Sequence, residues 1–150
     1  MNRKQLQIEV CKGMLNPDKN LAYAEVDCEN VAITTDGASC YVFSKRECIF
    51  DITKIRLVES LANFFTDNEN DVEIKSTGKL SRSSNGYFVE KFAGNGFNVY
   101  VDTKYIKLFA GNRYYTNGAR NRILVKDQLG RLIGLFLPIR HEESEVETDD

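Results

Sequence analysis

The chain contains 150 residues, of which 42% are hydrophobic and 28% charged, and its formal net charge is −2. This length suits a single globular domain with a sizeable core. No apolar run approaches the roughly 18 residues that a membrane helix requires, and the first residues lack the apolar segment of a secretory signal. We therefore expect a cytoplasmic protein with no membrane contact.

Charge is divided unevenly along the chain. All 20 Lys and Arg residues lie at or before Arg140, whereas six acids occur in the last nine residues, EESEVETDD. The preceding body carries +4 and this tail −6. A segment with so many acids and a single apolar residue cannot bury a core. The prediction is one domain over residues 1–140, followed by a disordered acidic tail over residues 141–150.

The four cysteines, Cys11, Cys28, Cys40 and Cys48, contain no C-x-x-C pair, and His141 is the only histidine. Structural zinc sites usually have closely spaced ligand pairs, because one tight turn presents two of the ligands. We expect no metal site and no other cofactor. The cysteines are expected to be reduced and to pack as small apolar side chains.

The first predicted elements are a helix and three strands. Leu6, Val10, Cys11 and Met14 recur at helical spacing over residues 3–15. Three short runs of alternating residues, separated by turn residues, then predict strands: LAYAEVD, NVAITTDG and SCYVFSK.

The segment after the third strand predicts a second helix. Asp51 or Thr53 offers a side-chain oxygen to an unpaired N–H group of the first turn. An apolar stripe at helical spacing follows, formed by Ile55, Val58, Ala62 and Phe65. Two alternating runs, DVEIKSTGKL and GYFVEKF, then predict strands joined by a polar loop.

The last third of the body repeats this order. FNVYVD predicts a strand, Asp102 or Thr103 caps the short helix KYIKLFAG, and Gly111 is expected to end it. Three further strands are predicted: RYYTNG, RILVKDQ and RLIGLFLPI.

Two passages about fifty residues apart, IFDITKIRLVESL and VYVDTKYIKLF, share this strand-cap-helix pattern. The predicted fold class is therefore α+β. It consists of repeated helix-plus-antiparallel-strand units whose helices pack on one face of a mostly antiparallel sheet.

The order of these motifs resembles a known family. VAITTDGASCYVF is followed by the capped segment CIFDITKIRLVESL, and the ending has strand, helix, two strands and a last strand that finishes LPIR. This order is similar to the sliding clamp of bacterial DNA polymerase, the beta-type processivity clamp, over most of residues 20–140. The resemblance implies a clamp-like domain whose helices line a channel around DNA. A clamp subunit has three domains, so a ring of this shorter chain would require a homo-oligomer or a partner chain.

The resemblance also implies basic side chains that face phosphates on the two repeated helices. Residues 113–140 add six bases against one acid. The candidates for nucleic-acid binding are Lys54, Arg56, Lys104, Lys107, Arg113, Arg120 and Arg122. Contacts of Lys and Arg with phosphate are independent of base sequence, and Tyr114 and Tyr115 suit stacking on single-stranded bases. The alternative is that these are ordinary solvent-facing charges.

No catalytic arrangement is recognisable. Ser44, Ser60 and Ser81 have no nearby histidine, and the GNG run of residues 94–96 precedes a strand instead of opening a helix. We expect a protein that is not an enzyme. The leading hypothesis is a clamp-like binding module that contacts duplex or single-stranded DNA, or the replication or repair machinery of a phage or mobile element. The alternative is a protein-binding inhibitor or adaptor, acting on a replication or host-defence protein without nucleic-acid contact.

Overall fold

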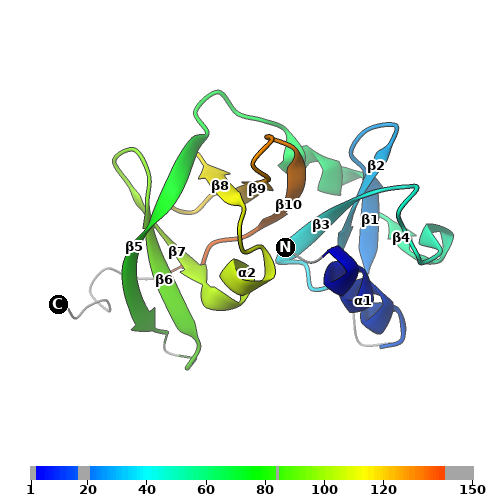
Figure 1. The fold of residues 1–150 in the computed structure, drawn as a ribbon, viewed down its shortest axis with the longest axis horizontal. Coiled ribbons are helices and arrows are strands. Elements are labelled where there is room, and N and C mark those ends of the chain that lie inside the picture. The colour runs from blue at the N-terminus through cyan, green and yellow to red at the C-terminus, as the bar shows by residue number, and fades with distance from the viewer. Residues whose placement is uncertain (1–2, 17–20, 84, 141–150) are drawn as a thin grey trace.

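The computed structural model describes residues 3–16, 21–83 and 85–140 (Figure 1). The predicted acidic tail over residues 141–150, which includes His141, lies outside the described residues. Two α-helices and two 3-10 helices occur in the described part. They are α1 (Arg3–Met14), η1 (Ile52–Lys54), η2 (Glu59–Phe65) and α2 (Thr103–Leu108).

The ten described strands belong to one sheet. They are β1 (Ala22–Glu25), β2 (Asn30–Thr34), β3 (Ser39–Ser44), β4 (Arg56–Leu57), β5 (Val72–Arg82), β6 (Phe88–Ala93), β7 (Asn98–Asp102), β8 (Arg113–Thr116), β9 (Ile123–Lys126) and β10 (Leu132–Phe136). Their order across the sheet is β4-β1-β2-β3-β10-β9-β8-β5-β6-β7. Neighbouring strands are antiparallel, except that β4 runs parallel to β1.

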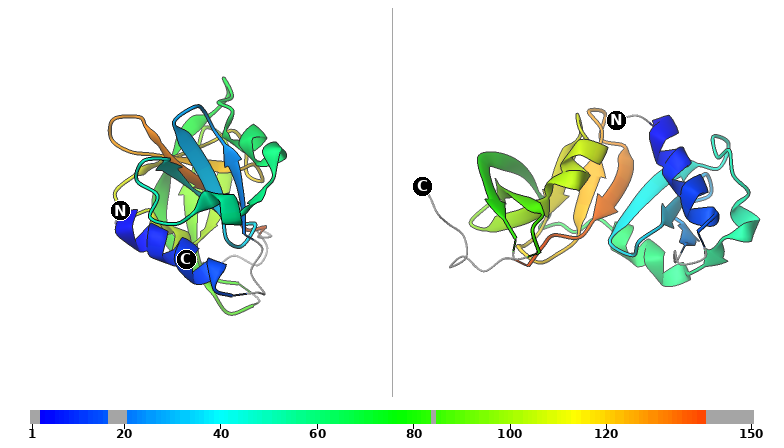
Figure 2. Two further views of the ribbon diagram at one scale, coloured as in Figure 1. Left: turned by 90° about the vertical axis from the view of Figure 1, so that its right-hand side faces the viewer. Right: turned by 90° about the horizontal axis from the view of Figure 1, so that it is seen from below.

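The sheet curls strongly in the half that follows residue 71. Ile139, just after β10, forms a β-bridge with Tyr100 of β7, and its N–H donates to the Tyr100 carbonyl at 2.8 Å. Because β10 lies mid-sheet and β7 lies at its end, this contact makes the strands from β10 to β7 nearly close on themselves (Figures 1 and 2). We call residues 72–140 the C-terminal half. The N-terminal half, residues 3–71 as far as described, holds α1 and β1 to β4.

An apolar cluster lies on each face of the sheet. In β2, Val31 and Ile33 face the larger cluster, whereas Ala32 between them faces the smaller one, as strand alternation requires. Helices α1, η1 and α2 contribute apolar residues to the larger cluster. In contrast, η2 covers the smaller cluster through Leu61 and Phe65.

This arrangement shows that the predicted fold class is wrong. Sequence analysis predicts repeated helix-plus-strand units, as in a sliding clamp, with the helices on one face. The structure is instead a ten-stranded mixed sheet with short helical segments on both faces. The two similar passages are not a structural repeat. IFDITKIRLVESL contains η1, β4 and the start of η2, whereas VYVDTKYIKLF contains most of β7 and all of α2.

The segment from residue 52 to residue 65 departs from the predicted helix because its apolar residues serve different faces of the sheet. Ile55 is buried in the larger cluster and Phe65 in the smaller one. One helix presents a single stripe to a single face, so it cannot reach both clusters. The chain becomes extended at Ile55 (φ −107°, ψ 142°), pairs β4 with β1, and resumes helical turns at Glu59. The β-branched residues of this stretch favour the extended path.

The other predicted elements are confirmed. Helix α1 coincides with the first predicted helix, and all nine predicted strands are present. Asp102 caps α2 by accepting the N–H of Lys104 at 3.0 Å, and Gly111 beyond the helix has a φ of +86°. Asp51 accepts the N–H of Thr53 at 3.0 Å, but this cap starts a 3-10 turn.

Candidate functional site

The predicted basic residues divide between the two halves of the molecule. Lys54 and Arg56 flank Ile55 near the β4 edge, where they line a pocket of about 370 Å³ beside the end of α1. Lys104 and Lys107 lie on α2, directly after β7 at the other end of the strand order. Figure 1 shows β4 and α2 in different halves. The fold therefore does not place the two pairs on equivalent helices.

The C-terminal half holds four exposed candidates. Lys107 is exposed on α2, and Arg113 and Arg120 are exposed at the start of β8 and in the turn after it. Lys104 lies over the ring of Tyr105, with its Nζ 5.0 Å from the ring centroid and 4.0 Å from the Asp102 carboxylate. All four side chains leave charge accessible to solvent on this half.

Arg122 has a structural position. Its guanidinium donates to both carboxylate oxygens of Asp71 at 2.9 and 3.0 Å. It also donates to the carbonyls of Phe64 at 3.0 Å and Thr66 at 2.8 Å. The side chains of Arg122 and Asp71 are only 11% and 10% exposed. Burial opposes ionisation of Asp71, but hydrogen bonds from Arg122 and from the N–H of Asn68 outweigh it and lower the pKa.

The two tyrosines that follow Arg113 have different environments. Tyr114 is buried, its hydroxyl donates to the Phe109 carbonyl at 3.2 Å, and its ring lies edge-on to Phe92 and Phe136. Burial raises the pKa of Tyr114 to about 12. Tyr115, on the other face, has the Nζ of Lys126 5.3 Å from its ring centroid. Tyr114 is thus core, and Tyr115 is partly buried against the smaller cluster.

Charge is segregated between the halves, which the sequence analysis did not notice. Residues 72–140 carry twelve Lys and Arg against four Asp and Glu, a balance of +8. Residues 1–71 carry eight bases against twelve acids, a balance of −4. The chain order alone contains this signal. It gains meaning because residues 72–140 form one curled part of the sheet.

The hairpin of β5 and β6 carries an exposed apolar and basic face that the sequence analysis also missed. Leu80 is 61% exposed and Phe88 is 52% exposed. The guanidinium carbon of Arg82 lies 5.4 Å from the centroid of the Phe88 ring. We call Leu80, Arg82 and Phe88 the hairpin face. The unusual length of β5, 11 residues, was the available signal, since strands commonly have five or six.

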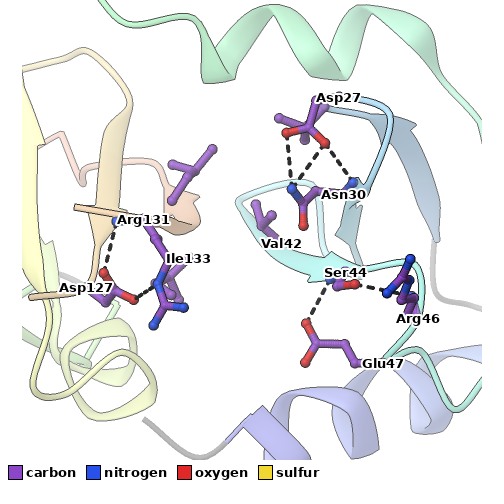
Figure 3. Close-up of a pocket in the computed structure, with 11 residues that line it drawn as sticks. Asp27, Asn30, Val42, Ser44, Arg46, Glu47, Asp127, Arg131 and Ile133 are labelled. Carbon is purple, nitrogen blue, oxygen red and sulfur yellow. Dashed lines mark hydrogen bonds and ion pairs between the residues drawn. The ribbon is translucent and has the colours of Figure 1, made fainter. Parts of the chain in front are cut away.

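A pocket of about 620 Å³ lies where β3 and β10 separate (Figure 3). Its carboxylates serve hairpin turns. Asp27 accepts from the side chain of Asn30 and the N–H of Glu29, which lowers the pKa of Asp27. The N–H and then the guanidinium of Arg131 similarly lower the pKa of Asp127. These acids stay ionised and tied to their own turns, so they are poorly suited to proton transfer.

Ser44 also lines this pocket, but its surroundings are structural. Its backbone N–H donates to the Glu47 carboxylate at 2.8 Å, and its hydroxyl accepts the N–H of Arg46 at 3.2 Å. Neither histidine nor cysteine is among the described lining residues. The described lining residues therefore offer Ser44 no histidine to act as the base that hydroxyl activation needs.

The described cysteines form no disulfide with one another, and they differ in exposure. Cys40 is buried in the smaller cluster, and this burial raises the pKa of its thiol to about 12. Cys28 is exposed between β1 and β2, so it does not pack as the expected core residue. Within residues 3–16, 21–83 and 85–140, no group of three or more His, Cys, Asp or Glu side chains is arranged to hold a metal ion. In the same residues, no helix has the length and apolar character to span a membrane.

Comparisons with protein-family models, with curated proteins and with solved structures gave no match to this chain.

Proposed function

We propose that this chain is a non-enzymatic binding module that contacts nucleic acid through its C-terminal half. The observation that carries the proposal is the net charge of +8 over residues 72–140, compared with a net charge of −4 over residues 1–71. A concentrated positive field attracts polyanions and raises their local concentration. Contacts with phosphate need only cations on an accessible surface.

Four exposed side chains of the C-terminal half form the proposed contact surface. They are Lys104, Lys107, Arg113 and Arg120. Arg122 is left out of the proposed interface, because its guanidinium is directed at Asp71 and two backbone carbonyls. Lys54 and Arg56 are also left out, because they belong to the N-terminal half, which has a net negative charge.

A cytoplasmic location is part of the proposal. It is supported by the four cysteines, which form no disulfide with one another and so suit a reducing compartment.

Two matched charge reversals test the proposal. The first variant, Lys107→Glu with Arg113→Glu, reverses two charges in the C-terminal half. The second variant, Lys54→Glu with Arg56→Glu, makes the same change in the N-terminal half. Binding to labelled duplex and single-stranded oligonucleotides is measured by fluorescence anisotropy over a series of salt concentrations. The first variant is expected to lower the log-log salt slope by roughly two and to weaken binding about tenfold or more at low salt.

The second variant has the same net charge as the first, so it is expected to bind nearly as the parent does. Equal weakening by both variants would mean that binding follows total charge, which contradicts the assignment to the C-terminal half. No binding by the parent at low salt would remove the nucleic-acid proposal. The protein-binding adaptor would then become the leading hypothesis.

A further inference from the structure

The residues of the hairpin face lie on the same side of two paired strands. The register pairs Leu80 with Glu90, Ser81 with Val89 and Arg82 with Phe88. Val89 is fully buried in the body of the molecule. Because side chains alternate along a strand, Leu80, Arg82 and Phe88 point to the opposite side, away from the core.

Local hydrogen bonds fix the outer part of this hairpin. Near the tip, the N–H of Ser83 donates to the Tyr87 carbonyl and the N–H of Gly86 to the Ser83 carbonyl, both at 2.9 Å. Arg82 Nε donates to the Gly86 carbonyl at 3.2 Å, which holds the guanidinium beside the Phe88 ring. A ligand that uses this face therefore meets an Arg82 side chain that is already ordered.

We propose that the hairpin face is a stacking surface that gives the protein a preference for single-stranded nucleic acid. The inference rests on the proposed function and names the class of nucleic acid. A base stacks on the exposed ring of Phe88, and Leu80 extends the apolar contact. Arg82, whose guanidinium lies beside the Phe88 ring, is placed to meet an adjoining phosphate. Single strands can offer free base faces to an aromatic ring, whereas a duplex keeps its bases stacked inside.

The charge around the hairpin face favours single-stranded nucleic acid over an apolar partner. Residues 75–91 carry four bases and a single acid, Glu90. The carboxylate of Glu90 is engaged by the hydroxyl of Ser76. Two copies of the chain docked through this face would bring like charges together, and that opposes association. A polyanion with exposed apolar rings complements both the charge and the aromatic surface.

The test uses the full chain and three labelled probes: oligo-dT, oligo-rU and a duplex, each of about 20 units, which exceeds a typical single-strand site. Phe88→Ala is expected to weaken binding of both single strands by about tenfold and to leave duplex binding unchanged. Phe88→Trp is expected to keep the affinity, because it restores an aromatic face. Phe64→Ala is the control, since Phe64 is similarly exposed at 49% but lies in the N-terminal half. Circular dichroism confirms that each variant is folded.

The outcomes separate the two proposals. The proposal of a stacking surface is wrong if Phe88→Ala leaves single-strand binding unchanged. It is also wrong if Phe88→Ala weakens duplex binding as much as single-strand binding. If, at the same time, the variant Lys107→Glu with Arg113→Glu binds all three probes more weakly than the parent does, the C-terminal half still binds phosphate and the proposed function stands. If the parent binds none of the probes, the proposed function fails, and the stacking surface fails with it.

Discussion

Gly134 in β10 is required by the close approach of its neighbours. A Cβ atom at this position would lie 2.5 Å from the carbonyl oxygen of Cys40 and 3.0 Å from the ring of Phe109. Phe109 is fully buried, and its ring stacks on Phe136 at a centroid distance of 6.0 Å. The missing side chain therefore allows the end of α2 to pack against the middle of the sheet.

We predict that Gly134→Ala lowers the free energy of unfolding by about 1–3 kcal/mol, because the added methyl group overpacks this contact. Urea denaturation followed by circular dichroism measures the change. Gly118→Ala is the control, since the added Cβ there meets only the side chain of Asn121. A loss at Gly134 no larger than the loss at Gly118 would contradict the packing argument.

Helix α1 contacts the loop after β3 through one buried amide, in addition to its apolar contacts with the core. The Gln7 side chain donates to the Glu47 carbonyl at 2.6 Å and accepts the N–H of Ile49 at 2.7 Å. Gln7 is 6% exposed, so these backbone groups have little access to water. A polar residue on the inner side of the helix thus fixes the loop that leads into η1.

Gln7→Ala should lower the free energy of unfolding by about 2 kcal/mol, because two backbone groups lose their partner in a buried place. The exposed neighbour in the same helix supplies the control: Gln5→Ala should change stability by less than about 0.5 kcal/mol. Thermal unfolding of both variants gives the comparison. Equal midpoints would show that the Gln7 amide does not hold the loop.

At the scale of the whole molecule, Arg122 joins the two halves. It lies just before β9, whereas its partners come from the end of η2 and from Asp71 before β5. The link from η2 to β5 is therefore held against the curled C-terminal half. Lys126 and Asp67 form a second contact between the halves at 3.2 Å, but Asp67 is 75% exposed. Water screens that pair, so we expect it to contribute little.

This difference predicts a pH dependence. Because the pKa of Asp71 is lowered in the fold, its ion pair stabilises the protein above the unfolded value of about 3.9 and is lost as pH falls through the folded value. Asp71→Asn should lower stability by about 2 kcal/mol at pH 7 and reduce the acid sensitivity of the urea midpoint. Asp67→Asn should change neither quantity appreciably. If the acid sensitivity of Asp71→Asn matched that of the parent, the Arg122 contact would not be the cause.

Local chemistry alone determined much of the element map. The apolar spacing of α1, the alternation of nine strands and the Asp102 cap depend on neighbours a few residues away, so the sequence predicted them. The uneven charge of the two halves is also present in the sequence. Only the tertiary structure decided on which face of the sheet each apolar residue packs. Ile55 and Phe65 pack on opposite faces, and for this reason they do not share a helix.

The same reason applies to the candidate site. Arg122 reads as a surface base until the fold brings Asp71 beside it, 51 residues away in sequence. Leu80 and Phe88 lie in predicted alternating strands, but only the strand pairing shows that Val89 points inward and that they point outward. Local residue patterns indicate where the elements lie, but contacts between distant segments decide which side chains are engaged inside the fold and which are exposed.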